Sequence, residues 1–439
     1  MKKRNRLHSE ANVLPDNLEL NDEFVGTFNL IENTVDSIFI TGKAGSGKST
    51  LLKYFKNNTG KNIAVLAPTG VAAVNIGGQT IHSFFKFPPR LIQKENIRRR
   101  RNNEIIRRLD TVIIDEVSMV RADLMDGIDY ALRINRDEMK LPFGGVQMVF
   151  FGDLFQLSPV VEREARDILE QRYSSPYFFS ANVFNKLKLR YVELNKNYRQ
   201  SDTKFIDLLN KIRNKTQVHA DLDLLNKRVR AITPKDSKRS VILTTTNSRA
   251  NAVNEGKLAD LPGKEYKYEA AITKDFNESA YPGEHCLRLK RGSQIILIRN
   301  DPEKRWVNGT IAKIVALSTD IIKVSINGDI HEVTKSSWEK IEYEYNRDED
   351  KIEERTIGTF EQYPIKLAWA ITIHKSQGQT FDNIVIDLGA GAFTHGQVYV
   401  GLSRCTSLKG IILKRPVNAS DIIFDERVHE FRNRFLNLV

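Results

Sequence analysis

The hydrophobic positions of the chain fall into short, unbroken runs, each followed by a turn and then by a polar or helical stretch. One set covers residues 37–40, 63–67, 112–114 and 148–151, and a second set covers residues 241–245, 384–388 and 411–413. Strands buried on both faces of a parallel sheet are hydrophobic throughout, whereas strands with one wet face alternate. The pattern therefore predicts an α/β fold with two parallel sheets, one for each set.

Between the members of the second set, the pattern changes to shorter strands of another kind, for example at residues 294–299 and 323–327. The dipeptide Asn327-Gly328 lies between two strand-like runs and predicts a tight hairpin, because both residues adopt positive φ readily. We therefore expect a small antiparallel barrel inserted into the second α/β domain. The charged stretch that follows it, residues 342–355, is expected to be a solvated hairpin or loop.

Composition defines the class of protein more broadly. A chain of 439 residues, 41% of them hydrophobic, suits two or three domains with proper cores. The chain has 67 Lys and Arg against 55 Asp and Glu, so its formal net charge is +12. This surplus favours an anionic partner, nucleic acid ahead of a membrane surface, although a merely basic enzyme fits it equally well.

Cysteines and apolar runs indicate the compartment. Cys286 and Cys405 are the two cysteines, and they make neither a disulfide framework nor a zinc site, which fits a reducing environment. No apolar run approaches the roughly 20 residues of a membrane span. The first nine residues are basic but lack the apolar core of a signal peptide. We expect a soluble, cytoplasmic protein.

The clearest chemical motif is residues 42–50, Gly-Lys-Ala-Gly-Ser-Gly-Lys-Ser-Thr, between an apolar strand and a helix-compatible stretch. A phosphate-binding loop requires this strand–loop–helix context, which makes a simple glycine-rich turn a poor alternative. Backbone N–H groups of such a loop surround phosphates, and the helix N-terminus adds partial positive charge. We expect Lys48 to reach the β- and γ-phosphates of a nucleotide and Ser49 to bind Mg²⁺.

Two further strand ends complete the expected nucleotide site. Asp115 and Glu116 follow the apolar run 112–114, and Gln156 follows the run 148–151. Downstream of a phosphate loop, Asp115 is expected to hold Mg²⁺ through water, and Glu116 to orient and deprotonate the attacking water. The amide of Gln156 is both donor and acceptor, so it can contact the γ-phosphate and this water together.

In their order along the chain, the motifs resemble those of a superfamily-one helicase of the RecD-like branch. The matching segments are residues 67–73 (motif Ia), 80–85 (Ib), 152–159 (III), 197–200 (IV), 370–380 (V) and 398–404 (VI). Within that branch the chain is most similar to the Pif helicases, through Leu-Pro-Phe-Gly-Gly-Val-Gln at 141–147 and Ser-Ala-Asn-Val-Phe at 180–184. Together these motifs cover most of the chain and are highly specific.

The resemblance implies two RecA-like P-loop domains, with a small pin-like insertion in the first and an SH3-like β-barrel insertion in the second. We place the first domain (1A) at residues 1–195, with its insertion (1B) at about 86–108. The second domain (2A) is placed at 196–289 and 366–439, with its insertion (2B) at 290–365.

The first insertion contains four consecutive arginines, residues 98–101. Such a basic run is typical of a nuclear-import signal, a solvated helix face or a nucleic-acid contact. Of these three we give most weight to the nucleic-acid contact, because the motifs on either side require a track for nucleic acid.

The resemblance also implies an activity. It is that of an ATP-dependent DNA helicase that moves 5′ to 3′ on single-stranded DNA and unwinds duplex, forked or G-quadruplex DNA. In the family this activity serves replication, repair, recombination and telomere maintenance. We accordingly expect ATP and Mg²⁺ as cofactors, single-stranded and forked DNA as partners, no membrane partner, and a monomer of bacterial or phage origin.

Residue roles follow from the same resemblance. Arg199 and Arg404 match the motif IV and VI arginines that complete the ATP site from the second domain, beside the catalytic Lys48, Glu116 and Gln156. The expected nucleotide-binding residues are Gly45, Ser46, Gly47, Lys48, Ser49, Thr50, Gln156, Arg199, Gly378 and Arg404. The expected DNA-binding residues are Pro68, Thr69, His82, Phe84, Thr246, Asn247, His374, Lys375 and Ser376.

Phe84 is the candidate for stacking on a base, with core packing as the alternative for it and for Phe85. The chain departs from the family near its N-terminus, where the glutamine that reads adenine is missing from residues 20–31. Asn21 and Asn29 are the candidate replacements.

Three other classes of protein are alternatives to a DNA helicase. A P-loop kinase or GTPase needs neither the second arginine set nor the segment 372–378, so it fits poorly. An ATP-dependent remodeller that does not unwind stays open, because the same two domains would serve it. A motor on RNA or RNA–DNA hybrids also stays open, because no residue that reads a 2′-hydroxyl is identifiable.

Overall fold

The computed structural model describes residues 21–436, apart from residues 89, 162, 201 and 238–239. The basic segment at the N-terminus of the sequence lies outside the described residues.

The first apolar set forms a six-stranded sheet in which every strand pair is parallel. The strand order is β3 (Gln79–Thr80), β2 (Ile63–Ala67), β4 (Thr111–Ile114), β5 (Gln147–Phe151), β1 (Ser37–Gly42) and β6 (Leu189–Leu194). Alternate side chains of a strand bury on opposite faces of this sheet: Ile38 and Ile40 join one core cluster and Phe39 joins another. Helices therefore have to cover both faces, which explains the unbroken hydrophobic runs.

The helices of this part are α1 (Asp22–Asn33), α2 (Lys48–Asn58), α3 (Gly70–Ile76), α4 (Ile81–Phe85), α5 (Glu104–Arg108), α6 (Ala122–Arg136) and α7 (Arg163–Arg172). Single 3-10 turns occur at η1 (Lys94–Asn96), η2 (Val117–Met119), η3 (Pro142–Gly145), η4 (Phe178–Ser180) and η5 (Asn182–Asn185). Residues of α1, α2 and α3 pack on one face of the sheet, and residues of α6 pack on the other.

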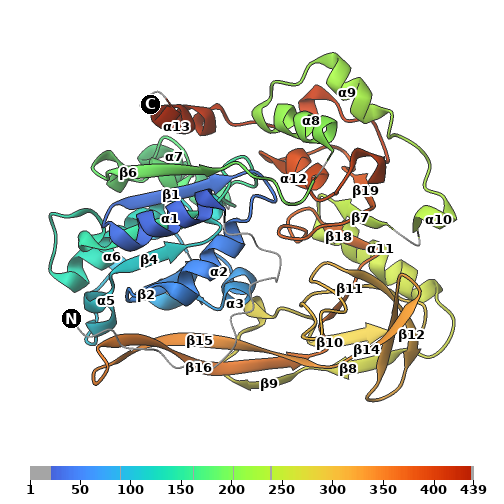
Figure 1. Cartoon of the computed structure of the whole chain (residues 1–439), viewed down its shortest axis with the longest axis horizontal. Coiled ribbons are helices and arrows are strands. Elements are labelled where there is room, and N and C mark those ends of the chain that lie inside the picture. Colours follow the sequence, from blue (N-terminus) through green and yellow to red (C-terminus); the bar gives the residue numbers. More distant parts are fainter. Residues whose placement is uncertain (1–20, 89, 162, 201, 238–239, 437–439) are drawn as a thin grey trace.

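The second apolar set forms a four-stranded parallel sheet in the order β18 (Ala370–Thr372), β7 (Val241–Thr244), β19 (Ile384–Asp387) and β20 (Ile411–Leu413). Its helices are α8 (Thr203–Asn214), α9 (His219–Asn226), α10 (Pro234–Ser237), α11 (Asn247–Asp260) and α12 (Gln397–Ser403), with 3-10 turns η7 (Leu408–Gly410) and η8 (Ala419–Asp421). The predicted α/β fold with two parallel sheets is confirmed, and Figure 1 shows the two sheets side by side.

The C-terminal helix α13 (Glu426–Leu436) returns to the first sheet, although the sequence placed it in the second domain. The ring of Phe431 lies 6.0 Å from that of Phe39 on β1, and Phe435 stacks on Tyr191 of β6 at 5.2 Å. Arg432 forms an ion pair with Glu193 at 3.0 Å. In Figure 1, α13 accordingly lies beside β6. The helix carries no motif, so only its packing reveals where it belongs.

The inserted β-structure contains a five-stranded antiparallel sheet. Its order is β14 (Asp329–Val333), β13 (Ile322–Ile326), β12 (Ile311–Leu317), β11 (Gln294–Leu297) and β17 (Ile365–Leu367). Between β13 and β14, Asn327 has φ 53° and Gly328 has φ 107°. The hairpin predicted from this dipeptide is thus confirmed.

Two smaller sheets extend the insertion beyond the range expected from the sequence. One contains β15 (Ser336–Asn346), β16 (Lys351–Gln362) and β9 (Ala271–Lys274), and the other pairs β8 (Tyr266–Glu269) with β10 (Cys286–Leu289); the turn η6 (Glu278–Ala280) lies between β9 and β10. Strands β8 to β10 precede residue 290, so the β-structure begins earlier than the sequence boundary. The long β15–β16 hairpin runs beneath α2 and α3 of the first domain in Figure 1.

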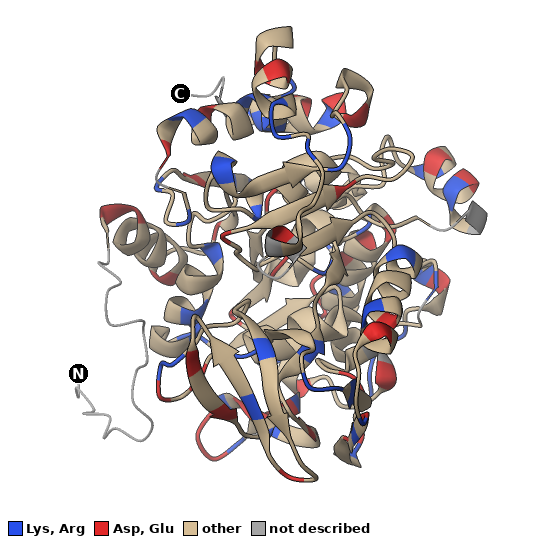
Figure 2. Ribbon diagram, turned by 90° about the vertical axis from the view of Figure 1, so that its right-hand side faces the viewer, with Lys and Arg blue, Asp and Glu red and all other residues tan. Residues whose placement is uncertain are grey.

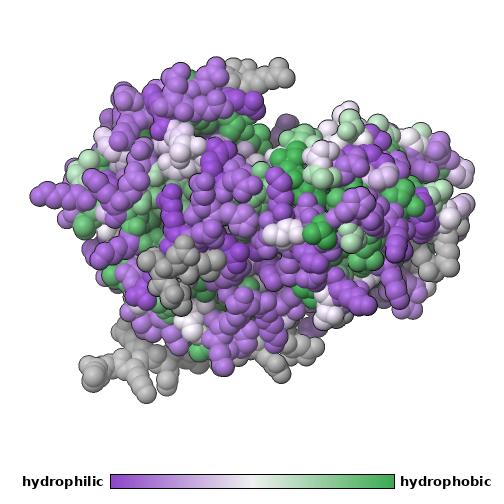
Figure 3. Space-filling model, turned by 90° about the horizontal axis from the view of Figure 1, so that it is seen from above, coloured by the Kyte–Doolittle hydropathy of each residue, from purple (hydrophilic) through white to green (hydrophobic). Residues whose placement is uncertain are grey.

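Charge and hydropathy vary over the surface. Lysine and arginine are spread over both α/β parts and the insertion rather than gathered in one of them (Figure 2). The face seen from above is mostly hydrophilic, with scattered hydrophobic groups (Figure 3). Within the described part of the chain, no helix is long and apolar enough to cross a membrane.

Candidate functional site

The glycine-rich loop joins the end of β1 to the start of α2, as the sequence predicts. Gly47 caps α2 with φ 86°, and a Cβ placed on it would lie 2.7 Å from the ring of Phe24. A Cβ on Gly45 would lie 2.6 Å from Cβ of Arg199, which arrives from the segment after β6. Both positions require glycine because of these close approaches and their left-handed backbone.

Lys48 turns its ammonium group into this loop. Nζ donates to the carbonyl oxygens of Gly42 at 2.6 Å and Lys43 at 3.2 Å. Burial lowers the pKa of Lys48, while the nearby carboxylates of Asp153 and Glu116 act to raise it. The ammonium is therefore held inside the loop. There, a hydrogen bond to a carbonyl oxygen can be replaced by one to a phosphate oxygen of a bound nucleotide. Ser49 and Thr50 lie beside it in the first turn of α2.

Asp115 and Glu116 end β4 as a turn rather than a continued strand. Glu116 has φ 49°, and its N–H donates to Oδ1 of Asp115 at 2.9 Å. A left-handed backbone at a residue other than glycine is strained and recurs at functional sites. Burial and the charge of Asp115 raise the pKa of Glu116 to about 7. A carboxylate with such a pKa is suited to accept a proton near neutral pH.

Gln156 lies in the loop after β5. Its Nε2 donates to Oδ2 of Asp153 at 3.1 Å. The other carboxylate oxygen of Asp153 accepts from Arg213 of α8 at 3.2 Å, and both side chains of this ion pair are at most 1% exposed. Asp153 and Arg213 were missed in the sequence: Asp153 lies within motif III, whereas nothing near Arg213 in the sequence indicates its position.

Arg199 and Arg404 meet on the second-domain side of the same loop. Arg404 is 1% exposed, and its guanidinium donates to neutral groups, the carbonyls of Val400, Ser376 and Gln379 and the hydroxyl of Ser403. Burial and the neighbouring Arg199 lower the pKa of Arg404 to about 9. Among the described residues, neither arginine has a carboxylate within ion-pair distance. Buried positive charge without a counterion favours an anionic ligand.

The second domain also contacts the loop through Tyr399 of α12. Its hydroxyl accepts a hydrogen bond from the N–H of Ala44 at 3.1 Å, and burial raises the pKa of Tyr399 to about 12. Tyr399 lies in motif VI but was not predicted as a site residue. Gly378, predicted beside the nucleotide, has open space around it and φ 77°.

Of the two asparagines considered as replacements for the missing glutamine, only Asn21 contacts residues near the loop. Its side chain caps α1 by accepting from the N–H of Phe24, and its Nδ2 donates to the hydroxyl of Tyr198 at 3.1 Å. Tyr198 in turn donates its N–H to the carbonyl of Gly45 at 2.9 Å. Asn29 is exposed on α1.

The predicted DNA contacts occupy matching places in the two α/β domains. Thr69 follows β2 and caps α3, and Thr246 follows β7 and caps α11. Both are exposed, as are Asn247 and Lys375. Pro68 and His82 are half-buried, and burial lowers the pKa of His82 and of His374. Exposed hydroxyl, amide and ammonium groups at strand ends are suited to hold phosphates.

Two of the predicted DNA-binding side chains, Phe84 and Ser376, are buried in this structure. Phe84 is 4% exposed and packs edge-on against Phe85 and Tyr343, so no base can stack on it. Ser376 is fully buried, and its hydroxyl donates to the carbonyl of Ile373 at 2.7 Å. The alternative of core packing therefore holds for both phenylalanines, Phe84 and Phe85.

The β15–β16 hairpin lies against the first domain near these positions. The hydroxyl of Tyr343 accepts from the N–H of Val65 at 2.9 Å and donates to its carbonyl at 3.3 Å. Strand β3 pairs only with Leu66 and Ala67, so Tyr343 satisfies the main-chain groups that β3 leaves free on β2. The prediction of a solvated hairpin for residues 342–355 is therefore only partly right.

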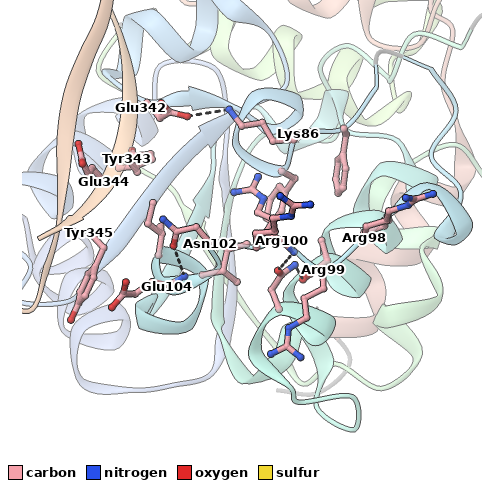
Figure 4. A pocket seen from close by; sticks show the side chains of 18 of the residues that line it. Lys86, Arg98, Arg99, Arg100, Asn102, Glu104, Glu342, Tyr343, Glu344 and Tyr345 are labelled. Carbon is pink, nitrogen blue, oxygen red and sulfur yellow. Dashed lines mark hydrogen bonds and ion pairs between the residues drawn. The ribbon is translucent and has the colours of Figure 1, made fainter. Parts of the chain in front are cut away.

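A cavity of about 810 Å³ lies between this hairpin and the insertion of the first domain (Figure 4). Its charged lining residues are Lys86, Arg98, Arg99, Arg100, Arg101, Arg347, Arg355, Glu104, Glu342 and Glu344. Of the four consecutive arginines, Arg99 pairs with Asp137 and Arg100 bonds to the carbonyl of Phe84. Arg98 and Arg101 are exposed and remain available for a phosphate.

Comparison with known proteins gives a consistent picture. The family model described as PIF1-like helicase matches residues 19–221. The ATP-dependent DNA helicase Pif1 of Bdellovibrio bacteriovorus is 33% identical over 98% of this chain and 95% of its own length. The ATP-dependent DNA helicase PIF1 of Homo sapiens is 32% identical over 85% of this chain, which spans only 58% of that larger protein.

Solved structures of Bacteroides Pif1 cover 96% of this chain and 98% of their own. The complex with ADP-AlF4 is 36% identical with a TM-score of 0.87, and the unliganded protein is 37% identical with a TM-score of 0.88. The same protein bound to single-stranded DNA gives a TM-score of 0.68 at 37% identity. The arrangement described above is thus more similar to the structures whose descriptions name no DNA.

Proposed function

The chain belongs to the PIF1-like helicase family, and from this premise we propose that it couples ATP hydrolysis to 5′-to-3′ movement along single-stranded DNA. The resemblance to Pif helicases and the RecA-like fold are confirmed, and the chain is an ATP-dependent DNA helicase. The direction of movement, the forked or G-quadruplex substrates and the service in genome maintenance are parts of the proposal. So are the residue roles, the domain limits and a monomeric state.

One observation carries the proposal: the buried Arg404 and the half-buried Arg199, both assigned to the second domain, lie beside the phosphate loop of the first. Arg404 and Arg199 have no carboxylate partner in the described structure, and Tyr399 from the same side contacts Ala44. An intact triphosphate bound by the loop would supply the missing negative charge. Closure of the two domains then depends on the γ-phosphate, and hydrolysis allows the domains to open again.

Within this site Glu116 is proposed to take the proton of the attacking water. Lys48 and the two arginines stabilise the charge that develops on the transferred phosphoryl group, an effect worth roughly 10³–10⁵ in rate for an arginine supplied across an interface. The raised pKa of Glu116 supports its assignment as the base.

Ser49 and Asp115 are proposed to hold Mg²⁺. One carboxylate oxygen of Asp115 accepts from Glu116, which leaves the other available, and Ser49 is exposed at the loop. No cluster of three metal-ligating side chains occurs among the described residues, so phosphate oxygens and water have to supply the remaining ligands. When bound, Mg²⁺ would neutralise phosphate charge.

For the nucleic acid, the track is proposed to run past Thr69 and Thr246, the two threonines that cap helices after equivalent strands. Pro68, His82, Asn247, His374 and Lys375 are the further candidates. Phosphate contacts of this kind fix a strand without reading its sequence. The bacterial relative that matches over nearly its full length supports a bacterial or phage origin.

The deciding experiment is strand displacement on matched duplexes with a 5′ or a 3′ single-stranded tail, with ATP and Mg²⁺. We expect unwinding of the 5′-tailed duplex only. Unwinding of the 3′-tailed duplex alone would contradict the direction. Hydrolysis without displacement of either would favour a remodeller that does not unwind, and preference for an RNA track would favour an RNA motor.

A further inference from the structure

The loop that carries Gln156 is held mainly by side chains of the second domain. Arg213, at the end of α8, reaches Asp153 of this loop, and its Cζ lies 3.9 Å from the centre of the Phe155 ring. The Nε2 of His395 lies 2.9 Å from the carbonyl oxygen of Leu154. Asp153, Leu154 and Phe155 thus each contact a side chain of the second domain, and Gln156 follows them directly in the chain.

A glycine brings the two domains still closer at this point. Gly396 caps α12 with φ 70°, and a Cβ on it would lie 2.4 Å from the carbonyl oxygen of Phe155 and 2.5 Å from that of Gln156. Any other residue at position 396 would push the helix away from the loop. The start of α12 therefore packs directly against the backbone of the loop.

Asp153 determines how the amide of Gln156 is turned. A carboxylate only accepts hydrogen bonds, so the nitrogen of the amide has to face Asp153. This uses one N–H and leaves the second N–H and Oε1 for other partners, and no described residue bonds to Oε1. One group that donates and one that accepts are what a γ-phosphate and an attacking water require.

Stability alone does not explain the Asp153–Arg213 pair. A buried ion pair is often no more stabilising than hydrophobic residues of the same volume, because two charges have to leave water. Here the cost is higher still, since Nε of Arg213 has no hydrogen-bond partner in the described structure. The pair does, however, connect the loop of Gln156 to a helix of the other domain.

We propose that Asp153 and Arg213 are positioning residues for ATP hydrolysis. Arg213, fixed on α8, holds the carboxylate of Asp153 in place, and Asp153 orients the amide of Gln156 toward the γ-phosphate. The orientation of Gln156 then depends on how the two domains are placed. This inference rests on the proposed function, in particular on the role proposed for Gln156.

The test is a set of double-mutant cycles on the full chain, with kcat and KM of the ATPase measured at saturating single-stranded DNA. Asp153→Asn and Arg213→Lys are each made alone and in a Gln156→Ala background. Arg213→Lys keeps the charge beside Asp153 but loses the fixed geometry of the guanidinium, so it tests the proposal even if Asp153→Asn does not fold. Asp301→Asn, which removes another buried carboxylate paired with an arginine, is the matched control in the barrel.

We expect each substitution to lower kcat by about 10- to 100-fold, with KM changed by less than about threefold, because the lost interaction acts in the transition state. In the Gln156→Ala background the same substitutions should lower kcat by less than about threefold, since residues acting through one another are not additive. Asp301→Asn should change kcat equally little in both backgrounds.

Equal losses of kcat in both backgrounds would overturn the inference, as would an unchanged kcat or a loss confined to KM. A wild-type chain without DNA-stimulated ATPase would instead overturn the proposed function itself. The two failures are therefore distinguishable.

Discussion

At the scale of single residues, the nucleotide site combines charges that would be unfavourable without a ligand. Burial and the charge of Arg199 lower the pKa of Arg404, and burial and the charge of Asp115 raise the pKa of Glu116. Bringing such groups together raises the free energy of the empty site, and a bound metal–triphosphate complex offsets it. Two predictions follow from these pairs.

The first concerns pH. Glu116 has to be ionised to accept a proton, and its pKa is about 7, so kcat/KM for ATP should fall as the pH drops below about 7 and level off above it. The measurement is ATPase activity from acidic to mildly alkaline pH, with saturating DNA and excess Mg²⁺. Glu116→Gln should bind ATP and DNA but retain only a low activity without this dependence. A wild-type profile that is flat through neutral pH would show that Glu116 is not the base.

The second concerns the arginine of motif VI. Arg404→Ala should lower kcat by about 10³-fold or more, because the guanidinium neutralises charge that develops in the transition state. Nucleotide affinity, measured by titration with a non-hydrolysable analogue, should fall far less. Arg230→Ala, at an exposed ion pair with Asp236, is the control. Comparable losses in rate and affinity would assign Arg404 to binding alone.

Sequence reasoning worked best for residues whose role depends on local order. Asp115 and Glu116 directly follow strand β4, and Lys48 begins the helix after strand β1. The hydrophobic pattern locates both strands, so the fold brings these residues together. Arg213 could not be found, because its partner is 60 residues away and the side chain is defined only by packing. The burial of Phe84 was likewise decided by Tyr343, which lies on a strand of another domain.

At the scale of elements, the β15–β16 hairpin replaces a missing strand neighbour on β2. Tyr343→Phe should lower the free energy of unfolding by about 1–3 kcal/mol, because it leaves the buried N–H and carbonyl of Val65 unsatisfied. Tyr345→Phe, on the same strand but with its hydroxyl on the exposed Asp350, should cost less than about 0.5 kcal/mol. Urea unfolding of both variants checks this. Equal stability of the two would mean that the hairpin does not stabilise the first domain.

Elements with a strong local pattern were predicted well, and those defined by distant pairing were not. Asn327-Gly328 forms the expected hairpin because the turn is a property of two residues. The pairing of strand β9 with β16 and the packing of helix α13 on β1 were not predicted, because neither leaves a periodic signal in the sequence.

At the scale of the whole molecule, the net charge of +12 has to act through exposed groups along the track. Binding of single-stranded DNA should weaken steeply with salt, with a slope of about −0.7 in log–log form for each phosphate neutralised. Fluorescence titration of a labelled oligonucleotide at several salt concentrations measures it. A slope near zero would remove the electrostatic track from this account.

The central claim is that the DNA strand and the arginines of the second domain act on one ATP site. It is tested most directly by the ATPase rate of the purified chain with and without single-stranded DNA. We predict that DNA raises kcat by at least about tenfold, equivalent to about 1.4 kcal/mol of the barrier, and that Arg404→Ala abolishes this stimulation. An equal rate with and without DNA would contradict the claim.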